Sequence, residues 1–333
     1  MIRPLILSLL LTIGLPGFVP VADAIEISRY PQLQALFEQL HDQHGFSYEK
    51  LNTLFQQVEI KQEVIDLMDR PGESRPWPAY RQQFVTVPSA NRGSRFWRRH
   101  QSALTKAQKK FGVDPAVIVA IIGVESRYGH SAGRIRTIDA LTTLTLKYPR
   151  RADFFRRELV QFLLLTREQQ MDPLAIKGSY AGAIGAAQFM PSSYRNYAID
   201  FDGDGRADLM GSRADAIGSV ANYFKRHGWK PGEPAVSKVV VEGTLYPWFR
   251  NLRIEPVLSL KQLSHYGIAP EQTNRDPELR AALIALDGKN GPEYRLSHNN
   301  YYVITRYNNN RKYAMAVYEL SEMIRKRVGQ SDS

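Results

Sequence analysis

Hydrophobic residues recur at intervals of three and four along most of the chain, which is the period of helices with one buried face. The pattern predicts helices between Ile27 and Arg70, from about Arg95 to Lys110, from Asp153 to Gln170, from Asp215 to His227 and from Tyr313 to Val328. We therefore expect a mainly helical protein.

Two stretches depart from this pattern. The proline-rich segment from Pro71 to Pro78 predicts an exposed linker. Within residues 235–305, the segments Val236 to Gly243 and Tyr301 to Tyr307 are rich in β-branched and aromatic residues, and turn residues lie between them. Such composition is typical of strands, so we expect one small β-containing module and an α+β protein.

One predicted helix is apolar on every face. Residues Val117 to Val124 carry no polar side chain, which predicts a helix buried inside its domain. Asp114 before it is a suitable N-cap, Pro115 suits the first turn, and Gly129 suits the end. Glu125 then lies in the last turn of this helix.

The predicted position of Glu125 has a chemical consequence. Burial and the negative end of the helix dipole both disfavour a carboxylate, so the pKa of Glu125 should rise. A glutamic acid that stays protonated near neutral pH can serve as a general acid. The alternative is a structural role, in which Glu125 forms an ion pair with Arg127.

A second group of carboxylates has the spacing of an EF-hand calcium loop. Asp200, Asp202, Asp204 and Asp208 occupy positions 1, 3, 5 and 9, and Gly205 occupies position 6. The alternative is a surface cluster of Asx-turns. Because carboxylates crowded without a cation would repel each other, we favour a calcium site.

The closing ligand of this loop departs from the EF-hand pattern. The carbonyl group of Arg206 can supply position 7, but position 12 is Gly211 instead of glutamate. Asp215, at the start of the next predicted helix, is the natural replacement. The site should be structural, because its ligands leave no obvious open position for chemistry.

Small residues dominate the segment from Gly178 to Ala187, which allows close approach of another backbone or of a ligand. Gln188 could bind an amide or hydroxyl group and Phe189 could stack on a sugar ring. The alternative is close helix packing, which the glycine and alanine content by itself favours.

Composition narrows the possible functions. The chain has 333 residues, 44 Lys and Arg against 33 Asp and Glu, a net charge of +11 and no cysteine. The absence of cysteine excludes disulfides, thiolate metal sites, cysteine nucleophiles and thioether lipid anchors. The positive charge favours a polyanionic partner, which could be nucleic acid, anionic lipid or a wall polymer rich in carboxylates.

Residues 1–24 have the features of a secretory signal peptide. Arg3 supplies the positive start, Leu5 to Leu15 is a short apolar run, and Ala22 to Ala24 offers a small-x-small cleavage site. The run is short for a membrane span, although an uncleaved tether is the alternative. We expect an exported, soluble protein, for which a wall polymer is a more suitable partner than nucleic acid.

Several motifs, in this order, closely resemble the membrane-bound lytic murein transglycosylase B family over residues 27–325. They are Gly123 to Gly129, Tyr148 to Arg151, Gly178 and Ser179, Gln188 to Ser193, Asp215 to Phe224, and Tyr302 to Tyr307. The resemblance implies a lysozyme-like helical core with an EF-hand-like loop, flanked by a helical domain and a small β domain.

The resemblance and the hydrophobic pattern together predict the domains. They are a signal peptide (1–24), an N-terminal helical domain (25–110, joined by 308–328), a lysozyme-like catalytic core (111–232, with the calcium loop at 200–215) and a small β domain (233–307).

The resemblance also implies an activity: non-hydrolytic cleavage of the β-1,4 bond between N-acetylmuramic acid and N-acetylglucosamine in peptidoglycan, giving 1,6-anhydro ends. Glu125 would be the sole acid and base. The glycan groove would contain Tyr80, Arg150, Arg151, Ser179, Gln188, Phe189, Met190, Tyr223 and Tyr307. Calcium would be bound by Asp200, Asp202, Asp204, Arg206 and Asp215.

A single acid is chemically consistent with this activity. Ordinary glycosidases need two carboxylates, whereas a substrate that supplies its own nucleophile needs one. The muramyl 6-hydroxyl can be that nucleophile, and the 2-acetamido oxygen can stabilise the cation.

The sequence departs from the family in two respects. The membrane-bound relatives carry a lipidated cysteine after the signal peptide, and this chain has none, so we expect a soluble periplasmic monomer. The loop from Asp200 to Asp215 is slightly longer than in the family's pattern, which bears on the ligand at Arg206.

Other functions are compatible with the same residues. One is a lysozyme-type hydrolase that uses a second carboxylate such as Asp139. Another is a non-catalytic scaffold that holds other cell-wall enzymes on peptidoglycan through its positive charge. A nucleic-acid binder is the most distant alternative.

Overall fold

The computed structural model describes residues 27–70 and 75–330. The expected signal peptide and the linker residues 71–74 lie outside the described residues. The longer helices are α1 (Pro31–His44), α2 (Tyr48–Phe55), α3 (Gln62–Met68), α4 (Trp77–Phe84), α5 (Val87–Arg99), α6 (Gln101–Phe111), α7 (Pro115–Ser126), α8 (Thr137–Lys147), α9 (Ala152–Glu168), α10 (Pro191–Tyr197), α11 (Arg213–Arg226), α12 (Leu260–Ser264), α13 (Asn299–Tyr307) and α14 (Arg311–Gly329).

Short 3₁₀ turns and strands complete the structure. The 3₁₀ turns are η1 (Ile27–Arg29), η3 (Pro149–Arg151) and η4 (Tyr246–Phe249). The strands are β1 (Ile135–Arg136), β2 (Lys177–Gly178), β3 (Val236–Ser237), β4 (Val239–Val241), β5 (Leu258–Ser259), β6 (Ile268–Pro270), β7 (Arg280–Gly288) and β8 (Gly291–Ser297). The protein is therefore mainly helical, as the hydrophobic pattern predicts.

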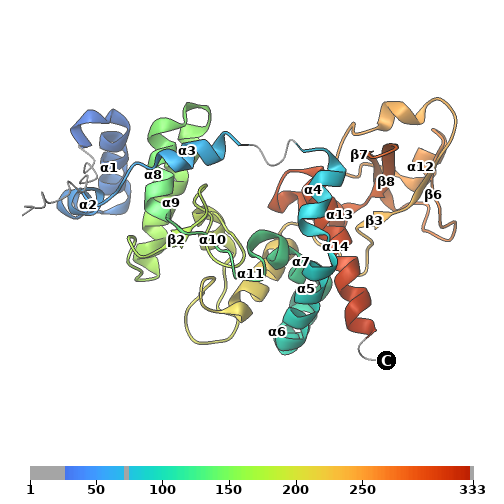
Figure 1. Ribbon diagram of the computed structural model, residues 1–333, viewed down its shortest axis with the longest axis horizontal. Coiled ribbons are helices and arrows are strands. Elements are labelled where there is room, and N and C mark those ends of the chain that lie inside the picture. Colours follow the sequence, from blue (N-terminus) through green and yellow to red (C-terminus); the bar gives the residue numbers. More distant parts are fainter. Residues whose placement is uncertain (1–26, 71–74, 331–333) are drawn as a thin grey trace, which may run out of the picture.

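The helices form an elongated molecule with the β module at one end (Figure 1). At the opposite end, α1 contacts α9 and α3 contacts α8. In the middle, α14 packs along both α5 and α7, and α11 packs against α6 and α7. Most buried apolar side chains belong to one continuous core, so α7 is surrounded by other helices.

The β module is built around a hairpin. Strands β7 and β8 are antiparallel from Ala282 opposite Ser297 to Gly288 opposite Gly291. They form the centre of a four-stranded sheet with the order β3-β8-β7-β5, and β4 and β6 form a separate antiparallel pair. A second small core, which includes Leu260, Leu263 and Leu296, stabilises this module.

The C-terminal limit of the predicted β segment is wrong. Tyr301 to Tyr307 lies in helix α13, and Tyr301 and Ile304 of this helix are fully buried. Burial of one helical face against α14 and β8 outweighs the weak strand preference of its β-branched and aromatic residues.

Two further expectations are corrected. The basic segment from Arg95 to Lys110 belongs to two helices, since α5 ends at Arg99 and α6 begins at Gln101. The predicted linker ends earlier than Pro78, because α4 starts at Trp77, which is 1% exposed.

Within residues 27–70 and 75–330, no helix combines the length and the apolarity that a bilayer crossing requires.

Candidate active site

The helix that carries Glu125 has the predicted cap and burial. The Asp114 side chain accepts a hydrogen bond of 2.8 Å from the backbone N–H of Ala116, and Pro115 occupies the first turn of α7. Val117 to Ile122 are all buried. The helix ends at Ser126, so Glu125 lies in its last turn, as predicted.

The chain reverses sharply behind Glu125. Arg127 and Tyr128 adopt left-handed backbone conformations with φ of 51° and 65°. The buried Tyr128 ring folds back onto α7, and its hydroxyl donates to the Ser89 carbonyl at 2.9 Å. A Cβ on Gly123 would lie 2.6 Å from this ring, so glycine is required at that position. These contacts hold the end of α7 in one orientation.

Glu125 is partly buried, and its carboxyl group accepts a hydrogen bond from the hydroxyl of Tyr313. Burial raises the pKa of Glu125 to about 7, and the hydrogen bond from Tyr313 opposes this increase. The expected rise in pKa is therefore present. The ion pairs of the described chain do not include the alternative pair with Arg127.

Sequence reasoning missed Tyr313. It is 188 residues from Glu125 along the chain, and the packing of α14 on α7 brings the two side chains together. One signal was available: Tyr313 begins an apolar helical stripe with Leu320 and Ile324. A buried tyrosine hydroxyl on such a stripe needs a hydrogen-bond partner.

Aromatic residues from several segments lie near Glu125. Burial, and then the charge of Glu125, raise the pKa of Tyr307 well above its ordinary value. The ring of Tyr307 lies 4.9 Å from that of Tyr223 and 5.7 Å from that of Phe189. Tyr80 on α4 is also buried, and it adds a small contribution to the raised pKa of Tyr313. The structure therefore brings four of the predicted groove residues to the surroundings of Glu125 and Tyr313.

The small-residue segment folds into tight turns beside this aromatic group. The Tyr307 hydroxyl donates to the Ala187 carbonyl at 2.5 Å. Gln188 has a φ of 49°, and its amide nitrogen donates to the carbonyl groups of Ala132 and Gly185, both at 2.9 Å. The orientation of Gln188 is thus fixed by backbone contacts.

Two other predicted groove residues belong to the same segment. The Ser179 hydroxyl accepts a hydrogen bond of 3.0 Å from the backbone N–H of Ala183. Met190 is partly buried and immediately precedes α10.

The two predicted arginines lie on η3, between α8 and α9. Both Arg150 and Arg151 are exposed. The guanidinium group of Arg151 lies 4.3 Å from the centre of the Phe154 ring, which is a cation–π distance. Among the described contacts, none connects either arginine directly to Glu125.

Asp139, the second carboxylate of the hydrolase alternative, is fully buried. Its two oxygens accept hydrogen bonds from the backbone N–H of Glu59 at 3.1 Å and from the Arg136 side chain at 2.7 Å. Burial raises the pKa of Asp139 despite these donors. This carboxylate therefore ties α8 to the segment before α3, and its enclosed position does not suit contact with a substrate.

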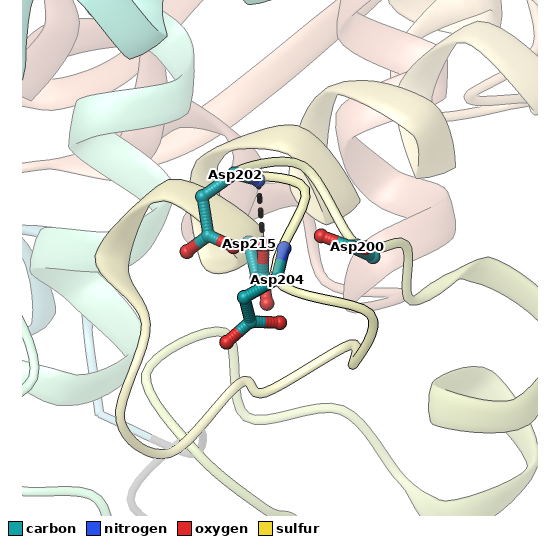
Figure 2. A group of neighbouring side chains, drawn as sticks. All are labelled: Asp200, Asp202, Asp204 and Asp215. Atoms are coloured by element: carbon teal, nitrogen blue, oxygen red, sulfur yellow. Dashed lines mark hydrogen bonds between the residues drawn. The ribbon is translucent and has the colours of Figure 1, made fainter.

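Four carboxylates of the predicted calcium loop converge. Asp200, Asp202, Asp204 and Asp215 each offer an oxygen, and these atoms all lie within 4.8 Å of one another (Figure 2). Asp215 is fully buried at the start of α11, whereas the other three are exposed. Asp215 thus occupies the place that the sequence predicts for the closing ligand.

Backbone hydrogen bonds shape this loop around the same carboxylates. Asp215 accepts from the N–H groups of Phe201 at 2.7 Å and Asp208 at 2.8 Å. Asp200 accepts from Gly203 at 2.6 Å and Gly205 at 2.9 Å. Such pre-oriented oxygen donors suit Ca²⁺, which prefers six to eight oxygen ligands.

The side chains of Asp208 and Arg206 are not part of this group of four carboxylates. The Asp208 side chain, at position 9, accepts from the N–H groups of Met210 and Gly211. The exposed Arg206 donates its backbone N–H to Asp204 at 2.9 Å.

Comparison with known proteins gives a consistent result. Residues 28–322 match the family model described as "Transglycosylase SLT domain". The chain is 40% identical over 309 residues to the membrane-bound lytic murein transglycosylase B of Escherichia coli, covering 90% of this chain and 84% of the relative.

Solved structures agree with this match. The soluble lytic transglycosylase SltB1 of Pseudomonas aeruginosa is 44% identical, with a TM-score of 0.84 over 90% of this chain and 100% of that one. The E. coli lytic transglycosylase Slt35 in complex with calcium is 40% identical, with a TM-score of 0.82 over 92% and 96%. SltB3 of P. aeruginosa in complex with NAG-anhNAM-pentapeptide is 29% identical, with a TM-score of 0.78 over 88% and 79%.

The family match spans nearly all of the described chain, including Glu125, the aromatic residues around it and the aspartate loop. The similarity in sequence and the similarity in fold to these proteins thus cover the same part of the chain. The chain belongs to the lytic murein transglycosylase B family, and it is a peptidoglycan-cleaving lytic transglycosylase.

Proposed function

We propose that the enzyme cleaves the β-1,4 bond between N-acetylmuramic acid and N-acetylglucosamine without water, and that Glu125 is its only acid and base. The observation that carries this proposal is the carboxyl group of Glu125, whose pKa burial raises to about 7 and which accepts a hydrogen bond from Tyr313. A group with this pKa can both donate and accept a proton near neutral pH.

In the first step, protonated Glu125 donates its proton to the glycosidic oxygen as the bond from this oxygen to C1 of the muramyl residue breaks. Positive charge develops at C1, and the substrate's 2-acetamido oxygen stabilises it. Glu125 becomes a carboxylate in a partly buried site. The hydroxyl group of Tyr313 then stabilises this carboxylate through a charge-assisted hydrogen bond.

In the second step, the carboxylate of Glu125 accepts the proton of the muramyl 6-hydroxyl while its oxygen forms a bond to C1. The product is a 1,6-anhydro ring, and Glu125 returns to its protonated state. No water is consumed, so the reaction needs no second carboxylate to activate a nucleophile. The burial of Asp139 and the clustering of the loop aspartates are consistent with this assignment. The complex of SltB3 with NAG-anhNAM-pentapeptide is also consistent with an anhydro product.

The residues that would line the glycan groove have different environments. Phe189 and Tyr223 are mostly buried, so we infer that they support the groove and present only an edge to the sugar. Gln188 and Ser179 are partly exposed and suit hydrogen bonds to sugar hydroxyl or acetamido groups. The remaining proposed groove residues are Tyr80, Arg150, Arg151, Met190 and Tyr307.

Mass spectrometry of the muropeptides released from purified sacculi tests the proposal. We expect the mature enzyme to release products that end in anhydromuramic acid and are one water lighter than hydrolysis products. Glu125→Gln should fold but release none. Glu49→Gln, which changes an exposed glutamate on α2, is the matched control and should retain activity.

Each other result rejects a definite part of the proposal. Hydrated products from the wild type would reject the anhydro mechanism and favour a hydrolase. Substantial turnover by Glu125→Gln would reject Glu125 as the acid. Binding of sacculi without any products would favour the scaffold alternative.

We also propose that the loop 200–215 binds a structural Ca²⁺ ion through Asp200, Asp202, Asp204, the carbonyl of Arg206 and Asp215. The support is the convergence of four carboxylates and the calcium complex of the related Slt35. Bound calcium would neutralise this crowded negative charge and fix the start of α11. It has no part in the proposed chemical steps.

The proposed place of action follows from the substrate. We infer that the signal-like residues 1–24 direct export, and that the mature enzyme acts in the periplasm as a monomer without a lipid anchor. We also propose other cell-wall enzymes as its partners. Cell fractionation with an antibody to the mature chain tests this, and retention of the unprocessed chain in the membrane fraction would contradict it.

A further inference from the structure

A basic cavity of about 450 Å³ is lined in part by the turn that follows Glu125. Helix α5 contributes Arg92, Arg95 and Arg99 to its wall. These positions are three and four residues apart, so they share one face of the helix. The opposite wall contains Arg213 of α11 and the turn that begins at Tyr128, which follows Glu125. We call this cavity the arginine pocket.

The charge of the arginine pocket is not neutralised within the described chain. Of the described residues that line it, none is acidic. The described ion pairs include none of its four arginines. Two histidines, His100 and His130, also line the pocket, and burial together with the charges of Arg99 and Arg213 lowers the pKa of His100.

The pocket has a fixed framework. Phe96 lies between the arginines on α5, and its ring centre is 5.6 Å from that of Tyr128 and 4.5 Å from that of His100. The side chain of Arg213 donates to the carbonyl groups of Met210 at 3.0 Å and Gly129 at 3.3 Å. These contacts hold Arg213 and the aromatic rings in place beside the cavity that all four arginines line.

Guanidinium groups gathered in this way favour a ligand with carboxylate or phosphate oxygens, because their planar donors match such groups in pairs. We propose that the arginine pocket binds the carboxylates of the peptide stem on the glycan strand that the active site cleaves. This inference rests on the proposed function of Glu125, and it identifies a second part of the substrate that the enzyme recognises.

The position of the pocket favours a peptide stem over a lipid surface or a nucleic acid. The lining turn is hydrogen bonded to the last turn of α7, from the N–H of Arg127 to Gly123 and of Tyr128 to Ile122, both at 3.1 Å. Tyr128 is the third residue after Glu125, so their Cα atoms are at most about 11 Å apart. A stem of several residues attached to a muramyl sugar near Glu125 is long enough to reach this distance. A concave site of this size also suits a single chain better than a flat membrane.

Comparing two substrates tests this inference. Soluble glycan strands that bear peptide stems would be compared with the same strands after an amidase has removed the stems. The variant Arg95→Gln/Arg99→Gln should raise KM for peptide-bearing strands about tenfold relative to peptide-free strands, with kcat nearly unchanged. Added salt should reduce the wild type's preference for peptide-bearing strands, because Arg92, Arg95 and Arg99 are exposed.

The matched control removes two positive charges outside the pocket. Arg98 on α5 and Lys109 on α6 are exposed and do not line it. The variant Arg98→Gln/Lys109→Gln should retain the wild-type ratio of the two KM values. An equal change of this ratio in both variants would indicate general charge attraction and would overturn the inference.

Other outcomes are equally decisive. An unchanged ratio in Arg95→Gln/Arg99→Gln, or an equal loss of activity on both substrates, would overturn stem binding at the pocket. If the wild type cleaved neither substrate, the proposed function would fail on its own. Binding of both strand types to Glu125→Gln, with and without the two arginine changes, would then still test the pocket.

Discussion

Replacing Glu125 by glutamine should stabilise the folded enzyme at pH 8 and leave its stability nearly unchanged at pH 4. The pKa of the Glu125 carboxyl is about 7 in the folded protein, against an ordinary value of 4.5, because burial disfavours its charge. An acid whose folded pKa is raised binds more protons when folded. Its contribution to stability is therefore complete below pH 4.5 and is lost as pH rises through 7. Glutamine has no charge to lose.

The pKa difference sets the size of this effect. The interval between 4.5 and about 7 corresponds to at most about 3.4 kcal/mol in the free energy of unfolding. Because the side chain is partly exposed, water reduces this cost, and we expect a gain of about 1.5–3 kcal/mol for Glu125→Gln at pH 8. For a chain of 333 residues, this is an increase in Tm of about 2–4 °C.

Calorimetric or circular-dichroism melting curves between pH 4 and pH 8 measure the difference. The wild type, Glu125→Gln and the surface control Glu49→Gln would be compared at each pH. The advantage of Glu125→Gln should grow between pH 5 and pH 7, whereas the control should show no such growth. A difference that is constant with pH, or that decreases as pH rises, would refute the assignment of a raised pKa to Glu125.

Two further predictions concern the hydrogen bond to Glu125 and the aspartate loop. Tyr313→Phe removes a donor that lowers the pKa of Glu125, so the alkaline limb of the pH–rate profile should move upward by about 1 unit. Tyr301→Phe, which removes a buried hydroxyl bonded to a backbone carbonyl, is the control, and an unmoved limb in Tyr313→Phe would contradict the role of this hydrogen bond. Chelation by EGTA should lower the Tm of the wild type by several degrees, because an ion bound only to the folded state stabilises it by mass action. Added Ca²⁺ should restore the Tm, and Asp215→Asn should abolish the response; an unchanged wild-type melting curve after confirmed ion removal would argue against an occupied site.

Local signals predicted the start and the burial of helix α7 correctly. The apolar run before Glu125 and the N-cap at Asp114 are close in sequence, and they are sufficient to place Glu125 in the last turn. The predicted end at Gly129 is three residues too late, because α7 ends at Ser126 and its left-handed cap is Arg127. The carboxylate spacing in the loop, with Asp215 as the closing group, was also predictable because neighbouring residues supply most of its geometry.

Predictions failed where packing overrides local preference. The residues from Tyr301 to Tyr307 have strand-like composition but form a helix, because burial of one face contributes more than intrinsic preference. Trp77 follows a proline-rich segment, yet it begins a helix and is buried. The hairpin of β7 and β8 was not located individually, although the turn between Gly288 and Gly291 is a recognisable signal.

The sequence by itself determined the mainly helical fold class, the family, the position of Glu125 near the end of a buried helix and the composition of the aspartate loop. These depend on periodicity, capping and motif spacing, which are properties of short segments. The tertiary structure decided the rest. It brings Tyr313 to Glu125 across 188 residues, encloses Asp139, and gathers arginines from α5 and α11 into one pocket. Such arrangements depend on how distant helices pack, and packing is set by the whole core instead of by any one segment.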